Sequence, residues 1–89
     1  MHMIKEAKIF AVLSDPARLE ILEYLSNKEG CVYELQTKTG RNQPNVSHHL
    51  RILRDAGLVE FKREGKNVCY FVSKPEVKKI IALAKKMSR

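Results

Sequence analysis

The polar side chains of residues 42–51 are of the types that read the edges of DNA base pairs. A guanidinium hydrogen-bonds guanine, an amide hydrogen-bonds adenine, and a hydroxyl can bond either. Four residues are therefore predicted to contact bases: Asn45, Ser47, His48 and Arg51. Asn42 and Gln43 precede them and suit phosphate contacts at the start of a helix. A solvated helix face without a partner is the alternative.

A second basic group lies further along the chain. Arg63 and Lys66 are predicted to contact phosphates or to enter a minor groove. Lys62 stands beside them and Asn67 follows, whereas Glu64 lies among them and weakens the positive patch. A hairpin end that only favours solubility is the alternative for each residue.

Two cysteines, Cys31 and Cys69, are the candidate redox residues. A pair of cysteines makes no disulfide framework, which favours a cytoplasmic location. A disulfide between them requires Cα atoms within about 7 Å of each other. Three interpretations stay open: two small packing side chains, a thiol redox pair, or part of a metal site.

The charge balance favours a nucleic acid as partner. The formal net charge is +7. Residues 1–35 hold four basic and six acidic residues, a net charge of −2, whereas residues 36–89 hold thirteen basic and four acidic residues, a net charge of +9. A small domain with one basic half has the electrostatic footprint of a nucleic-acid binder.

The chain of 89 residues is long enough for one domain, which we expect over residues 1–89. Its longest apolar runs, Ile9–Leu13 and Ile80–Ala84, are far shorter than the roughly twenty residues of a membrane span. We also expect no secretory signal. The short apolar runs predict no membrane partner. Because no phosphate-cradling loop and no nucleophile constellation is apparent, the sequence also predicts no enzyme and no cofactor.

The first half of the chain is predicted to be helical. A first helix over residues 3–13 carries apolar side chains on more than one face, so it needs more than one packing partner. Asp15 and Pro16 form an N-cap and first-turn pair, which begins a second helix that runs to residue 26. Four side chains of that helix are expected to face inward: Leu19, Ile21, Leu22 and Leu25.

A helix-turn-helix is predicted over residues 32–56. A short helix over residues 32–39 ends at Gly40, and Asn42 caps a second helix over residues 44–56. Val46, Leu50 and Leu53 form the core stripe of the second helix. His49 lies at the edge of that stripe and is predicted to be a hydrogen-bonded packing residue.

Strand patterns follow over residues 58–63 and 68–73, joined by a charged turn at 64–67. A last helix is predicted over residues 75–88. The order helix, helix, helix-turn-helix, hairpin, helix (α-α-α-α-β-β-α) predicts a mostly α-helical α+β fold, the winged helix, with the hairpin over residues 58–73 as the wing.

The chain resembles the ArsR-type (ArsR/SmtB) winged-helix repressors. Three stretches carry the resemblance: Leu13–Leu22 at the second helix, Gln43–Val59 over the second helix of the helix-turn-helix, and Arg63–Tyr70 in the hairpin. The resemblance implies a homodimer formed through the first and last helices, 3–13 and 75–88. It also implies repression of transcription at a double-stranded DNA operator with dyad symmetry.

The metal sites of that family are incomplete here. The family's Cys-Val-Cys-Asp/Glu-Leu box reads Cys31-Val32-Tyr33-Glu34-Leu35, so Tyr33 replaces the second cysteine. Residues 75–89 contain no His, Asp or Cys for the family's other site. We therefore predict no metal site, with a set of Cys31, Cys69 and His2 as the alternative.

Two alternative functions remain. One is a repressor that responds to thiol oxidation through Cys31 and Cys69. The other is a winged-helix module of the transcription machinery that binds protein. Such a module should expose an apolar patch on helix 44–56 or on the hairpin.

Overall fold

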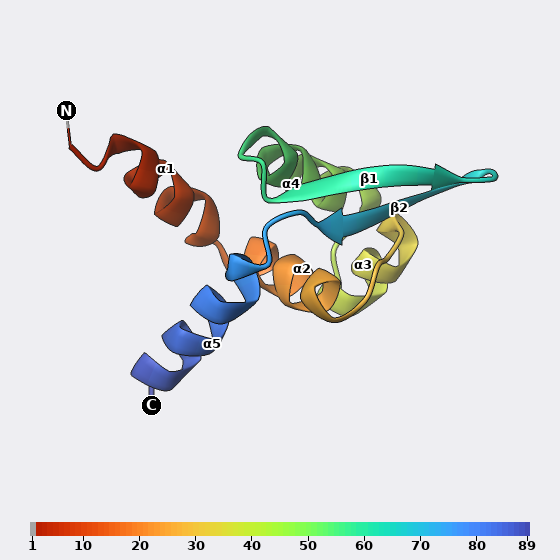
Figure 1. Ribbon diagram of the computed structural model, residues 1–89. Helices are drawn as coiled ribbons and strands as arrows, with labels where there is room; N and C mark the ends of the chain where they lie inside the picture. The colour runs from red at the N-terminus through yellow and green to blue at the C-terminus, as the bar shows by residue number, and fades with distance from the viewer. Residues whose placement is uncertain (1) are drawn as a thin grey trace.

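The computed structural model describes residues 2–89, and over these residues it has five helices and one antiparallel hairpin (Figure 1). The elements are α1 (Ile4–Leu13), α2 (Pro16–Asn27), α3 (Val32–Thr39), α4 (Gln43–Asp55), β1 (Val59–Glu64), β2 (Asn67–Val72) and α5 (Glu76–Met87). This order confirms the mostly α-helical α+β winged helix-turn-helix fold expected from the sequence. Helices α3 and α4 form the helix-turn-helix, and β1 and β2 form the wing.

Local side-chain signals set the helix starts. The Asp15 carboxylate accepts hydrogen bonds from the backbone N–H groups of Ala17 (2.8 Å) and Arg18 (3.2 Å). Asn42 likewise accepts one from the backbone N–H of Asn45 at 2.9 Å. These bonds satisfy amide groups that have no partner within the first turn of a helix. Gly40 closes α3 with a φ of +70°, as its predicted role at a helix end requires.

Several element ends differ by one residue from the sequence prediction. Met3 has a φ of +66°, so α1 begins at Ile4. Glu64 pairs with Asn67, which shifts both strands and leaves only two residues in the hairpin turn. Gly65 has a φ of +63°, as the first central residue of a two-residue type II′ turn requires.

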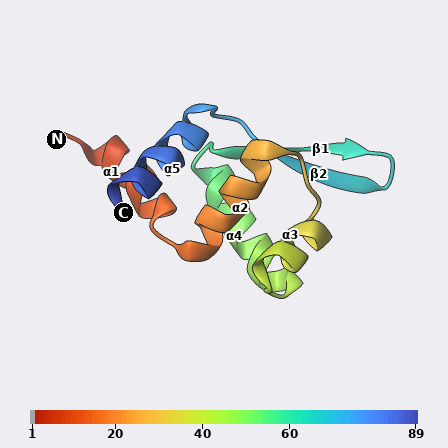
Figure 2. The same cartoon turned by 90° about the horizontal axis from the view of Figure 1, so that it is seen from below.

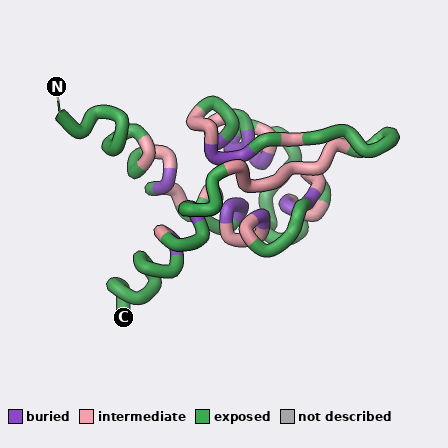
Figure 3. Tube along the Cα trace, viewed as in Figure 1, coloured by how far each residue is buried: buried purple, intermediate pink, exposed green. Residues whose placement is uncertain are grey.

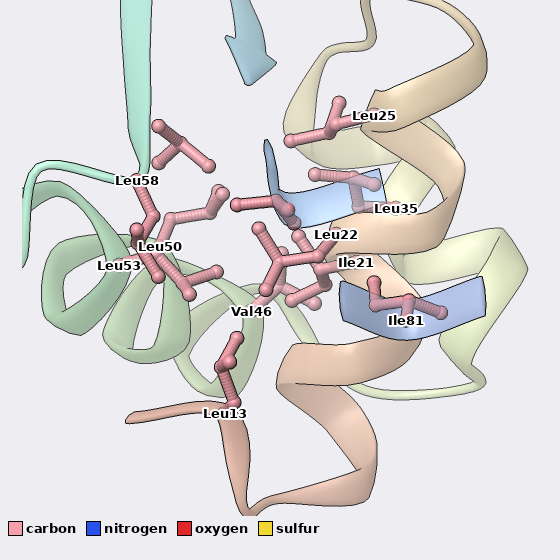
Figure 4. Packing of buried hydrophobic residues seen from close by; sticks show 12 residues of the cluster. Leu13, Ile21, Leu22, Leu25, Leu35, Val46, Leu50, Leu53, Leu58 and Ile81 are labelled. Carbon is pink, nitrogen blue, oxygen red and sulfur yellow. The ribbon is translucent and has the colours of Figure 1, made fainter. Parts of the chain in front are cut away.

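The core lies where α2, α3 and α4 meet the base of the wing and the start of α5 (Figure 4). The predicted stripe of Val46, Leu50 and Leu53 is fully buried there. Other elements contribute the remaining buried side chains of the cluster: Leu13, Ile21, Leu22, Leu25, Leu35, Leu58, Val59, Val77 and Ile81. This core gives α4 a fixed orientation, with one face held against the other helices.

The prediction that Leu19 faces inward is wrong. Leu19 is 38% exposed, whereas Ala17 is fully buried in its place. Because α2 begins at Pro16, its inward face runs through Ala17, Ile21 and Leu25 at intervals of four residues. Leu19 lies two residues from Ala17, on another side of the helix, and lines a shallow groove between α2 and α5.

Helices α1 and α5 leave the body of the molecule at the end opposite the wing tip (Figures 1 and 2). Most of their length is exposed, in contrast to the helices around the core (Figure 3). Val77 and Ile81 anchor α5 in the core, and Lys85 forms an ion pair with Glu23 of α2. Across residues 2–89, no helix has the length and apolar character that crossing a membrane requires.

Candidate nucleic-acid interface

The four residues predicted to contact bases lie on the side of α4 that faces away from the core. His48 and Arg51 are exposed, and Asn45 and Ser47 are half-buried beside them. Two hydrogen bonds orient the half-buried pair. Gln43 donates to the Ser47 hydroxyl at 3.2 Å, and Arg41 donates to the Asn45 side-chain oxygen at 3.4 Å.

Within residues 2–89, Arg51 has no hydrogen bond or ion pair, so its guanidinium donors are available to a partner. Asn42 differs, because its side-chain oxygen caps α4. Only the amide NH₂ of Asn42 is left to donate to a phosphate. The start of α4 therefore presents donors to a ligand, while the side-chain acceptor of Asn42 is already used.

His49 connects α4 to α2 on the buried side of α4. Its side chain is 6% exposed, and Arg18 donates to His49 Nδ1 at 3.1 Å. Arg18 also donates from Nε to the backbone oxygen of Val12 at 2.6 Å. One guanidinium thus connects α1, α2 and α4, and the prediction of a hydrogen-bonded packing histidine is confirmed.

The environment of His49 keeps its ring neutral. Burial disfavours the charged imidazole and holds the pKa of His49 below its ordinary value of 6.5. The charge of Asp15 opposes this shift and the charge of Arg18 adds to it. Because Arg18 can only donate, Nδ1 of His49 must be the acceptor, and the ring proton lies on Nε2.

The wing separates its basic residues onto different faces. Arg63 is opposite Val68, on the same face as Phe61 and Tyr70. Lys62 is opposite Cys69 on the other face, where it forms ion pairs with Glu29 (3.0 Å) and Glu64 (3.9 Å). The prediction of one basic cluster that includes Lys62 is therefore wrong. Arg63 and the tip residue Lys66 remain exposed and without an ion pair in residues 2–89.

Two arginines of this surface are absent from the sequence prediction. The Arg54 guanidinium lies 4.2 Å from the ring centroid of Phe61, a cation–π contact that joins the end of α4 to the wing. Arg41 precedes the cap of α4 and bonds Asn45. The basic character of residues 41–54 is visible in the sequence, but the contact with Phe61 depends on tertiary structure.

Glu34 ties the start of α3 to α2. Its carboxylate accepts hydrogen bonds from the backbone N–H of Cys31 (3.0 Å) and from the Tyr24 hydroxyl (2.8 Å), with Lys28 nearby at 3.7 Å. The hydrogen bond from the Cys31 backbone, followed by that from the Tyr24 hydroxyl and then that from the Cys31 side chain, lowers the pKa of Glu34 to about 2. A charged Glu34 thereby fixes the corner between α2 and α3.

Both cysteines are free and half-buried, Cys31 just before α3 and Cys69 in β2. A hydrogen bond to the Glu64 carboxylate, together with burial, raises the pKa of Cys69. Across residues 2–89, no three His, Cys, Asp or Glu side chains gather in a group that could hold a metal ion. His2 therefore does not complete a metal-binding set with Cys31 and Cys69. Tyr33, which replaces the second cysteine of the family's metal box, is 75% exposed.

Residues 15–60 match the model of a family described as bacterial regulatory protein, arsR family. Among individual proteins, the chain is similar to an uncharacterised helix-turn-helix-type transcriptional regulator of Methanocaldococcus jannaschii. The two are 41% identical over 80 residues, which cover 89% of this chain and 90% of the relative. A probable mercury resistance operon repressor of Streptomyces lividans is 37% identical over 94% of this chain and 67% of its own length.

A solved structure with the same fold comes from Mycobacterium bovis. It is described as a homodimeric winged helix-turn-helix DNA-binding domain of a possible ArsR-family transcriptional regulator. It superposes with a TM-score of 0.84 at 32% sequence identity, and the match covers 94% of this chain and 78% of that one.

Proposed function

Since this chain belongs to the arsR family of bacterial regulatory proteins, we propose that it represses transcription as a homodimer bound to an operator with dyad symmetry. It is a DNA-binding transcriptional regulator of the winged-helix type and not an enzyme. Membership of the family does not by itself specify which residues of this chain read DNA, which surface forms the dimer or the symmetry of the site.

The observation that carries the proposal is the outer face of α4. It exposes His48 and Arg51 beside the half-buried Asn45 and Ser47. A helix of 13 residues is about 20 Å long, and the major groove, about 12 Å wide, admits a helix. We assign base contacts to these four residues. Asn45, Ser47 and His48 lie in the first half of α4, the part of a recognition helix that usually lies closest to base edges, and Arg51 follows His48 by three residues on the same face.

Residues around α4 support a role in holding the phosphate backbone. The amide group of Asn42, the side chain of Gln43 and the guanidinium of Arg41 lie at the start of the helix. Arg63 and Lys66 extend the same basic character along the wing. Phosphate contacts set position and orientation on the duplex, whereas contacts to bases carry the specificity.

The exposed apolar side chains of α1 and α5 support dimerisation. Phe10 of α1 is 61% exposed, and Leu83 of α5 is 58% exposed. Apolar residues gathered on two helices at one end of the molecule suit an interface with a second copy. A twofold dimer would carry a net charge of 2 × 7 = +14 and would place two copies of α4 about one DNA turn apart.

The alternative of a protein-interaction module finds no support on the surface of α4 or of the wing. The large apolar side chains that are exposed in residues 2–89 lie elsewhere: Met3, Ile4, Phe10, Leu19, Tyr33, Leu83 and Met87. A module that binds protein through α4 or the wing should expose an apolar patch there.

Fluorescence anisotropy with two duplexes tests the proposal. One duplex comes from the region upstream of the protein's own gene, and the other has the same composition in scrambled order. We expect the native duplex to bind at least about 10³-fold more tightly, as specific sites do. Equal and steeply salt-dependent binding to both duplexes would show that only the basic surface is engaged, which contradicts an operator-binding repressor.

A further inference from the structure

We propose that Cys31 and Cys69 form a reversible intramolecular disulfide that clamps the wing to the start of the helix-turn-helix. The inference goes beyond the proposed function, because it concerns a covalent site within the monomer. The observation that carries it is a short antiparallel pairing between the segment before α3 and strand β2.

Gly30 and Tyr70 form a hydrogen-bonded antiparallel pair. The Gly30 N–H donates to the Tyr70 carbonyl at 3.1 Å, and the Tyr70 N–H donates to the Gly30 carbonyl at 2.8 Å. Cys31 follows Gly30, and Cys69 precedes Tyr70. In an antiparallel pairing these two cysteines are therefore the next pair of opposite residues. The residues beside such a pair form a non-hydrogen-bonded pair, which in a regular sheet has Cα atoms about 4.5 Å apart. A disulfide needs a Cα separation of about 4.4–6.8 Å.

The backbone of Cys31 agrees with a non-hydrogen-bonded position. Its φ of −90° and ψ of 170° are extended, as in a strand. Its N–H donates to the Glu34 carboxylate at 3.0 Å, and its carbonyl accepts from the N–H of Leu35 at 3.2 Å. Both backbone groups of Cys31 thus bond to α3, as those of an N-cap residue do, and neither bonds to β2, which is compatible with a non-hydrogen-bonded position.

An ion pair independently shows which face the two cysteines share. Cys69 is directly opposite Lys62 in the hairpin, so both side chains lie on one face of the wing. Lys62 reaches Glu29 on the neighbouring segment at 3.0 Å. Because side chains alternate along an extended segment, Glu29 and Cys31 share a face. That face is the one occupied by Lys62 and Cys69.

The segment before α3 is held rigidly enough to keep this register. A Cβ atom at Gly30 would lie 2.8 Å from the ring of Tyr24, so the ring packs closely against the Gly30 backbone. The hydroxyl of the same tyrosine donates to Glu34 at 2.8 Å. Both thiols are half-buried, which leaves them within reach of a small oxidant.

The oxidant is a low-molecular-weight disulfide. One cysteine thiolate attacks a sulfur of the oxidant, forms a mixed disulfide and releases one small thiol. The second cysteine thiolate then attacks the protein sulfur of the mixed disulfide and releases a second small thiol. Overall, two protein thiols lose two electrons and two protons, and one small disulfide is reduced to two thiols.

The bond would close a loop that contains α3, α4 and β1, which are the elements that present the DNA-reading residues. The backbone pairing that the bond requires is already present, so closure needs no movement of α4. We therefore expect oxidation to stabilise the fold and to leave operator binding intact.

The full-length protein, incubated with oxidised glutathione and then with dithiothreitol, tests the clamp. We expect a reversible mass loss of about 2 Da and a peptide in which Cys31 is joined to Cys69. We also expect a rise in Tm on the order of 10 °C. Cys31→Ser and Cys69→Ser should show neither change, with Cys31→Ala and Cys69→Ala as substitutes if a serine variant fails to fold.

Glutathione adducts or disulfide-linked dimers in place of the internal bond would overturn the proposal, as would an unchanged Tm. Anisotropy on the oxidised protein should give an operator affinity within about threefold of the reduced protein. A loss above tenfold would overturn the clamp. If the reduced protein fails to bind any operator, only the proposed function fails, because the disulfide is detected by mass.

Discussion

Helix α4 and the terminal helices α1 and α5 expose opposite kinds of surface. On α4 the apolar stripe is fully buried and the outer face is polar and basic. On α1 and α5 large apolar side chains remain exposed, among them Phe10 and Leu83. The first region has its core complete within the monomer, whereas the second has apolar surface left over.

This difference indicates two different partners. A polar helix face supported by a finished core can bind a polyanion without changing its own packing. An exposed apolar surface lowers its free energy only when another apolar surface covers it. Substitutions in the two regions should therefore disturb different properties: stability and DNA binding at α4, and assembly at α1 and α5.

The largest effect is expected from the core beneath α4. Leu50→Ala should lower the free energy of unfolding by about 2–5 kcal/mol, because it leaves a cavity in a fully buried cluster. Urea denaturation measures the change. Leu83→Ala, at an exposed site, should cost less than about 0.5 kcal/mol at protein concentrations where the chain is monomeric. Equal losses for the two variants would remove the distinction between the regions.

The next effect concerns assembly. Phe10→Glu should weaken the proposed dimer by at least about 100-fold, because it places an unpaired charge in an apolar interface. Sedimentation velocity measures the dissociation constant. Tyr33→Glu is the matched control, since Tyr33 is also an exposed aromatic residue but lies on α3. A dimer that persists in the Phe10 variant would contradict an interface through α1.

DNA binding should show an intermediate effect. Arg51→Ala should cost about 1–3 kcal/mol on the operator and relax specificity, because the arginine is assigned to a base edge. Lys66→Ala should weaken binding to all sequences alike and reduce the salt slope by about 1. Anisotropy on the operator and on single-base variants separates the two behaviours. Unchanged operator affinity for Arg51→Ala would refute the assignment of Arg51.

The smallest effect should be a loss of stability on acidification, through His49, which connects α4 to Arg18 of α2. The pKa of His49 is lowered in the folded state, so the unfolded chain binds a proton more readily. The contribution of His49 to the free energy of unfolding is therefore fully present above pH 6.5. It is lost as the pH falls from 6.5 to the lower pKa of the folded state. Urea midpoints between pH 7.5 and 5.5 should decline less in His49→Gln, which keeps an acceptor for Arg18. The same decline in both proteins would exclude His49 as the cause.

Much of the fold follows from short-range patterns in the sequence. The Asp15 cap, the Asn42 cap and the glycine at the end of α3 are all found where their residue types predict them. The core stripe of α4 and the inward position of His49 follow from the same helical periodicity. Leu19 is the exception, since two apolar faces of α2 fit the pattern and only packing selects between them.

The candidate site was predicted less completely. The outer face of α4 follows from the helical period, but the role of Lys62 does not. Strand alternation assigns Lys62 and Arg63 to opposite faces, yet only the fold brings Glu29 beside Lys62. The contact of Arg54 with Phe61 likewise joins two elements whose relative position the sequence does not specify.

By itself, the sequence determined the order of the elements, the polar face of α4 and the excess of basic charge in the second part of the chain. Capping, periodicity and charge depend on neighbours within a few residues, so a single chain displays them directly. Only the tertiary structure decided that Gly30 pairs with Tyr70, because this pairing joins segments far apart in the chain. Such contacts form through the burial of a shared core, and no local pattern encodes their register.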